Sequence, residues 1–155
     1  MLKYNTIIFL DEDGTGLAPY ASVAFEGKMH SLGIWDLNVG SKGNVVLFSE
    51  PANQKIAELA EKRGLSLADY RSEEMNGSEF SESTLILAFN AEVKQQIYDR
   101  FPNAVNVYTI RELLGGSGDL RLPVGGSIDD YEAVCTAADR IADELLESLM
   151  GLIRK

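Results

Sequence analysis

The apolar run Ile7–Leu10 constrains this chain more than any other feature, because it leads directly into an acidic, glycine-rich turn. A continuous apolar run of this kind is typical of a strand buried on both faces of a parallel sheet. The turn, residues 11–16, is followed by Pro19, and proline suits the first position of a helix. We therefore expect a strand over Thr6–Leu10, a loop, and a helix over Tyr20–Ser31.

The rest of the chain alternates between short apolar runs and longer amphipathic segments. The further strands expected are Trp35–Val39, Thr84–Phe89 and Asn106–Ile110, and the further helices are Pro51–Arg63, Glu92–Arg100 and Tyr131–Ile153. Such alternation predicts a parallel sheet with helices on both faces. With 155 residues, 45% of them hydrophobic, the chain has the size of one globular domain. The predicted fold is one α/β domain over residues 1–155, a three-layer α/β/α arrangement around a four-stranded parallel sheet.

Three segments between these elements carry separate expectations. Gly40–Gly43 is expected to be a loop. Val45–Phe48 is compatible with a strand, a packed loop or an exposed apolar patch, and we expect it to pack in the core. Glycines at 115, 116 and 118 and at 125–126 bracket residues 119–123, which predicts a mobile loop, suited to act as a lid, close to the last helix.

Composition excludes several classes of function. Lysine and arginine total 14 and aspartate and glutamate total 24, so the formal net charge is −10 and most faces repel a nucleic acid. The sequence has neither an apolar run long enough to span a membrane nor a leader pattern at its start, so we expect a cytoplasmic protein without a membrane partner. A single cysteine, Cys135, and a single histidine, His30, leave no internal disulfide and no cluster with zinc-ligand spacing.

The acidic turn has one local resemblance that suggests phosphoryl transfer. An apolar strand followed by Asp11-x-Asp13-Gly-Thr resembles the first motif of the haloacid-dehalogenase-like phosphatases. That chemistry implies Asp11 as nucleophile, Asp13 as acid/base and Mg²⁺ as the bridging metal. The family's other groups are poorly matched: Ser49 and Lys55 or Lys94 imitate two of them, while the acidic pair 129–130 follows a glycine-rich loop and not a strand.

Across nearly the whole chain, the order and spacing of several stretches resemble the low-molecular-weight protein tyrosine phosphatases and the related arsenate reductases. Residues 11–19 take the place of the family's phosphate loop, Cys-x5-Arg-Ser-Pro, and Pro19 is kept. Leu37–Ser41, Gly64–Ser72 and Leu85–Asn90 fall where that family has its next conserved stretches, and residues 119–127 fall on its Asp-containing loop before the terminal helix. The resemblance implies the same three-layer fold.

The same resemblance implies that the catalytic positions have been replaced. Asp11 stands in the place of the nucleophilic cysteine, and Leu17 in the place of the arginine that binds the phosphoryl oxygens. Ala18 replaces the loop serine, and Leu122 replaces the general-acid aspartate. We therefore expect a degenerate family member without cysteine-dependent phosphatase activity. Its expected role is as a binding or regulatory module, with no catalytic residues, no cofactor and no metal.

Two interpretations of the loop Asp11-Glu12-Asp13-Gly14-Thr15-Gly16 stay open. In the first, Asp11 folds into its own loop, accepts the backbone N–H groups that hold phosphate in the family, and remains a permanent internal anion. In the second, Asp11 and Asp13 bind Mg²⁺ and the protein is a metal-dependent phosphohydrolase. We favour the first, with the loop rim, Gly40–Phe48 and Gly115–Gly126, as the surface for an unidentified protein partner or small ligand.

Overall fold

The computed structural model describes residues 4–115 and 119–153. The strands are β1 (Thr6–Asp11), β2 (Asn38–Gly43), β3 (Thr84–Ala88) and β4 (Val107–Thr109). The helices are α1 (Leu17–Ser31), α2 (Gln54–Lys62), α3 (Ala91–Arg100), α4 (Ile110–Leu114) and α5 (Ile128–Ile153), with one 3-10 turn, η1 (Gly77–Glu79). Within these residues, no helix is long and apolar enough to cross a membrane.

The four strands form one parallel sheet in the order β2-β1-β3-β4. The central strand β1 pairs with β2 from Thr6↔Asn38 to Asp11↔Gly43, and with β3 from Thr6↔Thr84 onward. Because β1 lies between two strands and under helices on both faces, its residues must be apolar throughout, which explains the run in the sequence. The carboxyl end of β1 therefore lies between the carboxyl ends of β2 and β3.

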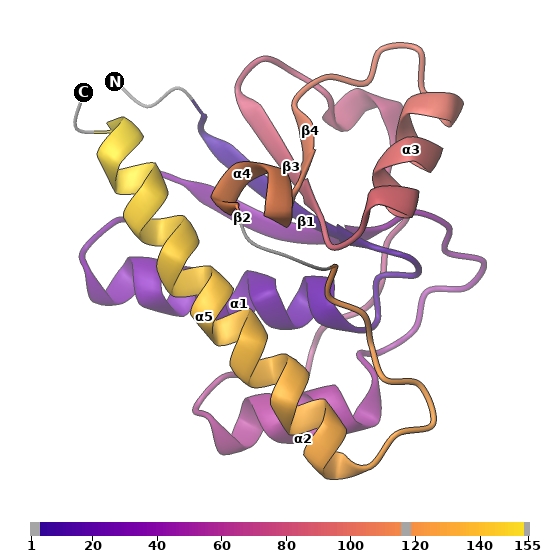
Figure 1. Ribbon diagram of the computed structural model, residues 1–155, viewed down its shortest axis with the longest axis vertical. Coiled ribbons are helices and arrows are strands. Elements are labelled where there is room, and N and C mark those ends of the chain that lie inside the picture. Colours follow the sequence, from indigo (N-terminus) through magenta and orange to yellow (C-terminus); the bar gives the residue numbers. More distant parts are fainter. Residues whose placement is uncertain (1–3, 116–118, 154–155) are drawn as a thin grey trace.

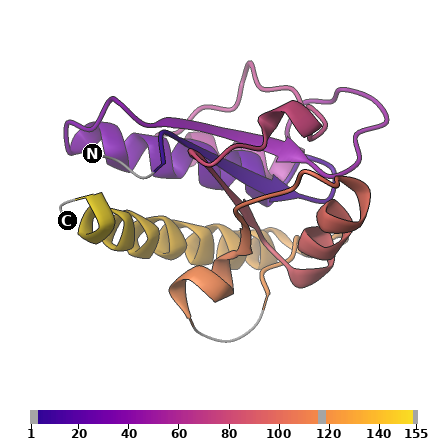
Figure 2. The same cartoon turned by 90° about the horizontal axis from the view of Figure 1, so that it is seen from above.

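Helices cover both faces of the sheet (Figures 1 and 2). On one face, Ile7 and Phe9 of β1 pack with residues of α1 and α5. On the other face, Ile8 and Leu10 pack with Val93 of α3. A third cluster joins α1, α2 and α5 beside the sheet. The predicted three-layer α/β/α fold with a four-stranded parallel sheet is therefore confirmed.

Some predicted boundaries are wrong. The second strand is Asn38–Gly43 and not Trp35–Val39, so the predicted loop Gly40–Gly43 is the strand itself. Glycine and polar residues disfavour a strand locally, but hydrogen bonding to β1 overrides that preference. Helix α1 begins at Leu17, two positions before Pro19, and the short helix α4 was not predicted.

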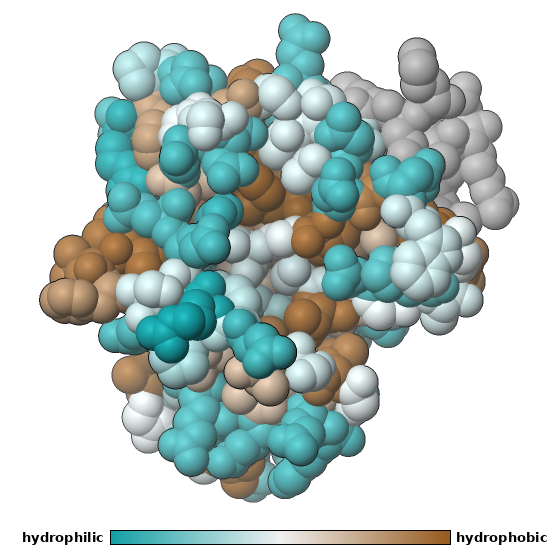
Figure 3. All heavy atoms as spheres, turned by 180° about the vertical axis from the view of Figure 1, so that it is seen from behind, coloured by the Kyte–Doolittle hydropathy of each residue, from teal (hydrophilic) through white to brown (hydrophobic). Residues whose placement is uncertain are grey.

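The apolar segment Val45–Phe48 is exposed, so the expectation that it packs in the core is wrong. Leu47 is 83% exposed and Phe48 is 77% exposed. The loop that follows β2 protrudes from the body of the molecule (Figure 1), and in the view from behind a brown, hydrophobic group stands out at the left edge (Figure 3). Its first two residues are held by hydrogen bonds: Val45 N–H donates to Glu12 O at 3.0 Å, and Val46 N–H donates to a Glu74 carboxylate oxygen at 3.0 Å.

Two glycines of β2 provide a matched test of how closely β2 approaches the acidic loop. A Cβ atom added to Gly43 would lie 2.4 Å from the carbonyl carbon of Asp13, whereas a Cβ on Gly40 would meet nothing within 4 Å. We expect Gly43→Ala to lower the free energy of unfolding by about 1–3 kcal/mol, because backbone must move to relieve the overlap. Gly40→Ala should change it by less than about 0.5 kcal/mol. Urea denaturation of the two variants checks this, and equal stabilities would contradict the close approach.

Candidate functional site

The carboxylate of Asp11, at the end of β1, accepts hydrogen bonds from the loop that follows it. Gly14 N–H donates to Oδ1 at 2.6 Å, while the N–H groups of Gly16 and Ala18 donate to Oδ2 at 3.3 and 3.0 Å. Asp11 is only 3% exposed. The loop and the first turn of α1 therefore converge on a side chain of the protein itself, which is the geometry expected of the self-occupied loop.

The charge state of Asp11 depends on its burial and its hydrogen bonds. Burial raises the pKa of Asp11 to about 7. The hydrogen bonds from Ala18 and Gly14 act in the opposite direction but do not outweigh desolvation, and the negative charges of Asp13 and Glu12 raise the pKa further. Burial therefore acts against the permanent charge expected for Asp11, and its charge state near neutral pH stays a prediction that the pH dependence of stability can test.

The other two carboxylates of the loop point to different partners. Glu12 accepts a hydrogen bond from the Asn90 side-chain amide at 2.7 Å. Asp13 accepts bonds from both the N–H and the hydroxyl of Thr15, at 3.0 and 2.8 Å. In the described part of the chain, no group of three or more His, Cys, Asp or Glu side chains is arranged to hold a metal ion.

Neighbouring elements hold the loop in shape. Gly14 has φ of +79°, a left-handed conformation that favours glycine, and its carbonyl accepts a hydrogen bond from the Tyr70 hydroxyl at 2.5 Å. The same hydroxyl accepts a hydrogen bond from Ser41 of β2 at 3.2 Å. Asn53, the N-cap of α2, donates its N–H to Thr15 O at 2.7 Å. Strand β2, helix α2 and the segment before η1 thus all contact the loop, and the sequence analysis missed the part played by Tyr70.

The three other positions at which the family resemblance implies replaced catalytic groups carry apolar side chains. Leu17 and Ala18 begin α1 and are buried, 3% and 0% exposed, so neither can bind an anion with its side chain. Leu122 lies against the loop, because a Cβ added to Gly16 would be 3.1 Å from one of its methyl carbons. The structure therefore brings Leu122 to the loop, and it places a hydrocarbon surface there.

A cation stands next to Leu122 and was also missed. The guanidinium of Arg121 lies 4.0 Å from a Glu12 oxygen, 3.3 Å from Glu92 and 3.9 Å from Asp119. Arg121 is half exposed, so each of these contacts contributes little to stability. They nevertheless orient the guanidinium toward carboxylates of the protein. Glu12 and Glu92 are far from Arg121 in the chain, so no local sequence pattern indicates these contacts.

Groups that the haloacid-dehalogenase resemblance would need have other partners. Lys94 is bound by Glu112 at 2.7 Å, and Lys55 donates to Gly126 O at 2.9 Å. Asp130 accepts from Ser127 N–H at 3.0 Å, at the start of α5. Cys135 is fully buried in α5, as expected, and burial raises the pKa of its thiol to about 11.

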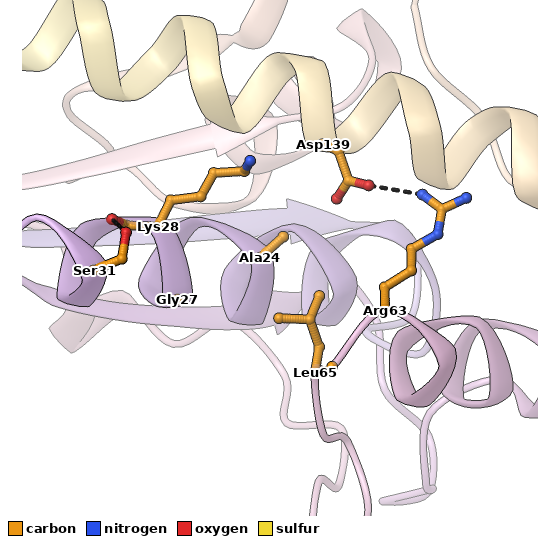
Figure 4. Close-up of a pocket in the computed structure, with 8 residues that line it drawn as sticks. Ala24, Gly27, Lys28, Ser31, Arg63, Leu65 and Asp139 are labelled. Atoms are coloured by element: carbon orange, nitrogen blue, oxygen red, sulfur yellow. Dashed lines mark hydrogen bonds and ion pairs between the residues drawn. The ribbon is translucent and has the colours of Figure 1, made fainter.

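A hollow of about 560 Å³ lies between α1, α2 and α5, away from this loop (Figure 4). Its two cations are paired with α5: Arg63 with Asp139 at 2.7 Å and Lys28 with Asp143 at 2.7 Å. Asp139 also accepts a hydrogen bond from the Tyr20 hydroxyl at 2.9 Å. These contacts join three helices, so we interpret the hollow as a structural junction.

Comparison with known proteins agrees with the fold. Residues 6–152 match the model of the low molecular weight phosphotyrosine protein phosphatase family. The chain belongs to this family. A protein-arginine-phosphatase from Geobacillus stearothermophilus is 26% identical to this family member over 92% of its chain and 95% of the relative's.

Two solved structures show the same relationship. The low molecular weight protein tyrosine phosphatase from T. tengcongensis superimposes with a TM-score of 0.85 at 24% identity, covering 92% of this chain and 97% of that one. A YwlE arginine phosphatase superimposes with a TM-score of 0.85 at 26% identity, covering 94% and 95%. The latter is a cysteine-to-serine mutant with a phosphorylated active-site serine.

The raised pKa of Asp11 predicts a specific dependence of stability on pH. The folded-state pKa is about 7 and the ordinary pKa of an aspartate is 3.8, so between these values the folded protein holds a proton that the unfolded chain has lost. The contribution of Asp11 is full below pH 3.8 and is lost as the pH rises through 7. The stability of the wild type relative to Asp11→Asn should therefore fall by a few kcal/mol from about pH 5 to about pH 8.

Urea unfolding of both proteins across this range measures the difference. Asn is nearly isosteric with Asp and does not titrate, so other ionisable groups cancel in the comparison. A difference that grows with pH would mean that the hydrogen bonds outweigh burial and that the folded pKa of Asp11 lies below its ordinary value.

Proposed function

We infer that this chain is a member of the low-molecular-weight phosphatase family without cysteine-dependent chemistry, acting as a module that binds a protein partner. The observation that carries this proposal is the occupancy of the loop: one carboxylate accepts the N–H groups of Gly14, Gly16 and Ala18. A phosphoryl group would need the same donors. The loop therefore already has an acceptor of its own for these N–H groups.

The chemistry available near the loop supports the same proposal. A cysteine phosphatase needs a thiolate, but the thiol of Cys135 is fully buried in α5 and its pKa is raised to about 11, so it stays protonated near neutral pH. The positions of the phosphate-binding arginine and the general acid carry Leu17 and Leu122. In the YwlE relative a serine in place of the active-site cysteine is phosphorylated, and we place Asp11 at that position.

The rim of the loop supplies a surface for a partner. The segment after β2 presents Leu47 and Phe48 to solvent, 83% and 77% exposed, on a backbone whose Val45 and Val46 N–H groups are fixed. Exposed aromatic and aliphatic side chains on a rigid support are suited to protein contacts, because little conformational entropy is lost on binding. The net charge of −10 argues against a nucleic acid, and we keep a cytoplasmic location as part of the proposal.

The first test is catalytic. The purified protein should not hydrolyse an aryl phosphate or a phosphoarginine peptide above the buffer rate, because no thiolate is available at the loop. Phosphate release with wild type and Cys135→Ser measures this, and the two should be indistinguishable. Hydrolysis that Cys135→Ser abolishes would overturn the proposal, and hydrolysis that requires Mg²⁺ and Asp11 would favour the metal-dependent alternative.

The second test is occupancy of the loop. Asp11→Ala leaves buried N–H donors without an acceptor, so it should lower the free energy of unfolding by about 1–3 kcal/mol. The unpaired N–H groups should then donate to a bound sulfate or phosphate. Either anion should raise the melting temperature of the variant but not of the wild type. In the metal-dependent alternative Asp11→Ala instead relieves repulsion and raises stability. A wild type stabilised only by Mg²⁺ and phosphate together would contradict our proposal.

A further inference from the structure

The outer edge of β2 has backbone groups that the sheet does not use. β2 is the edge strand of the sheet, visible along its upper border in Figure 2. Asn38 N–H donates to Asn5 O at 2.9 Å and Asn44 N–H donates to Asp11 O at 2.8 Å, so the even-numbered positions point their N–H groups toward β1. Because these directions alternate along a strand, Val39 and Ser41 point theirs outward, as does Gly43.

Only the end of this edge is paired. Gly43 N–H donates to Glu73 O at 2.9 Å, and Gly43 O accepts from Met75 N–H at 2.8 Å, which makes a single parallel bridge between Gly43 and Glu74. Within residues 4–115 and 119–153, no hydrogen bond joins the outward N–H or C=O of Val39 or Ser41 to another element. The segment around Glu74 therefore pairs with β2 at this one bridge and then turns away from the edge.

A groove of about 500 Å³ lies along the unpaired part. One wall is β2 over residues 38–42, and the segment that contains Asp69, Tyr70 and Arg71 contributes the other. Thr6 and Ile8 of β1 and Ser22 of α1 also line it, and a Cβ added to Gly40 would meet nothing within 4 Å. Unpaired edge groups beside an open groove are the arrangement to which an extended peptide adds as a strand.

We propose that this groove is a strand-addition site, in which an extended, positively charged segment of a partner protein pairs with the backbone of Val39 and Ser41. The charges of the groove favour a positively charged partner, because its lining holds three carboxylates, Asp69, Glu73 and Glu79, and two cations, Lys42 and Arg71. Lys42 is held by Glu73 at 2.6 Å and by Glu79 at 3.6 Å. This inference rests on the proposed binding role and names the chemistry of the partner. A second copy of the chain is a poor occupant, because each copy carries a net charge of −10.

Amide hydrogen exchange observed by NMR tests the pairing directly. In the free protein the amides of Val39 and Ser41 should exchange faster than those of Gly40 and Lys42, which point toward β1. The probe is an acetylated, amidated peptide of alternating valine and threonine with a lysine at each end. Its addition should slow exchange at Val39 and Ser41 by about tenfold or more. The same peptide N-methylated at alternate residues cannot form the ladder and should have no effect.

A substitution in the groove supplies the matched control. Gly40→Lys places a long, positively charged side chain in open space and does not require a left-handed backbone, so the variant should fold, and should repel and obstruct the cationic peptide. Ala133→Lys adds the same charge on an exposed position of α5, outside the groove, and should bind the peptide like the wild type. Absence of peptide binding to the wild type, equal binding to Gly40→Lys, or protection caused by dimerisation would each overturn the proposal.

The phosphate-release assay on the same samples separates the two proposals. Peptide binding together with cysteine-dependent hydrolysis would overturn the non-catalytic role and leave the groove standing. Absence of both would overturn the groove alone.

Discussion

The carboxyl group of Asp11 is the contact on which the arrangement of this end of the molecule depends. It lies at the end of the central strand and receives N–H groups from the loop and from the first turn of α1. Buried N–H donors need an acceptor, and the first turn of a helix always has donors that its own backbone cannot satisfy. One side chain therefore connects strand, loop and helix, and burial raises its pKa to about 7 as a consequence.

Around this contact, side chains from other parts of the chain pack on the acidic loop. Leu122 lies on Gly16, and the Tyr70 hydroxyl donates to the Gly14 carbonyl. The apolar loop after β2 and the free edge of β2 instead project outward on either side of the Gly43–Glu74 bridge. Membership of the phosphatase family describes the fold, and the binding of another polypeptide by these accessible groups is our proposal.

Much of the fold could be predicted because local pattern and tertiary role agree. The apolar runs of β1 and β3 are buried on both faces, and the amphipathic helices α2 and α3 bury Ile56 and Val93. Prediction failed for β2, where glycines, asparagine and lysine give no strand signal. It failed again at Phe48, since a short apolar segment has the same sequence whether a core or solvent surrounds it.

The sequence by itself determined the order of strands and helices, the acidic net charge, and the absence of cysteine from residues 11–19, because these follow from residue identity and spacing. Only the tertiary structure decided that Glu12 turns to Asn90 and how far burial shifts the pKa of Asp11. It also decided that β2 is an edge strand with one bridged residue. Hydrogen-bond direction and desolvation depend on residues distant in the chain, and a local pattern of residues carries no information about them.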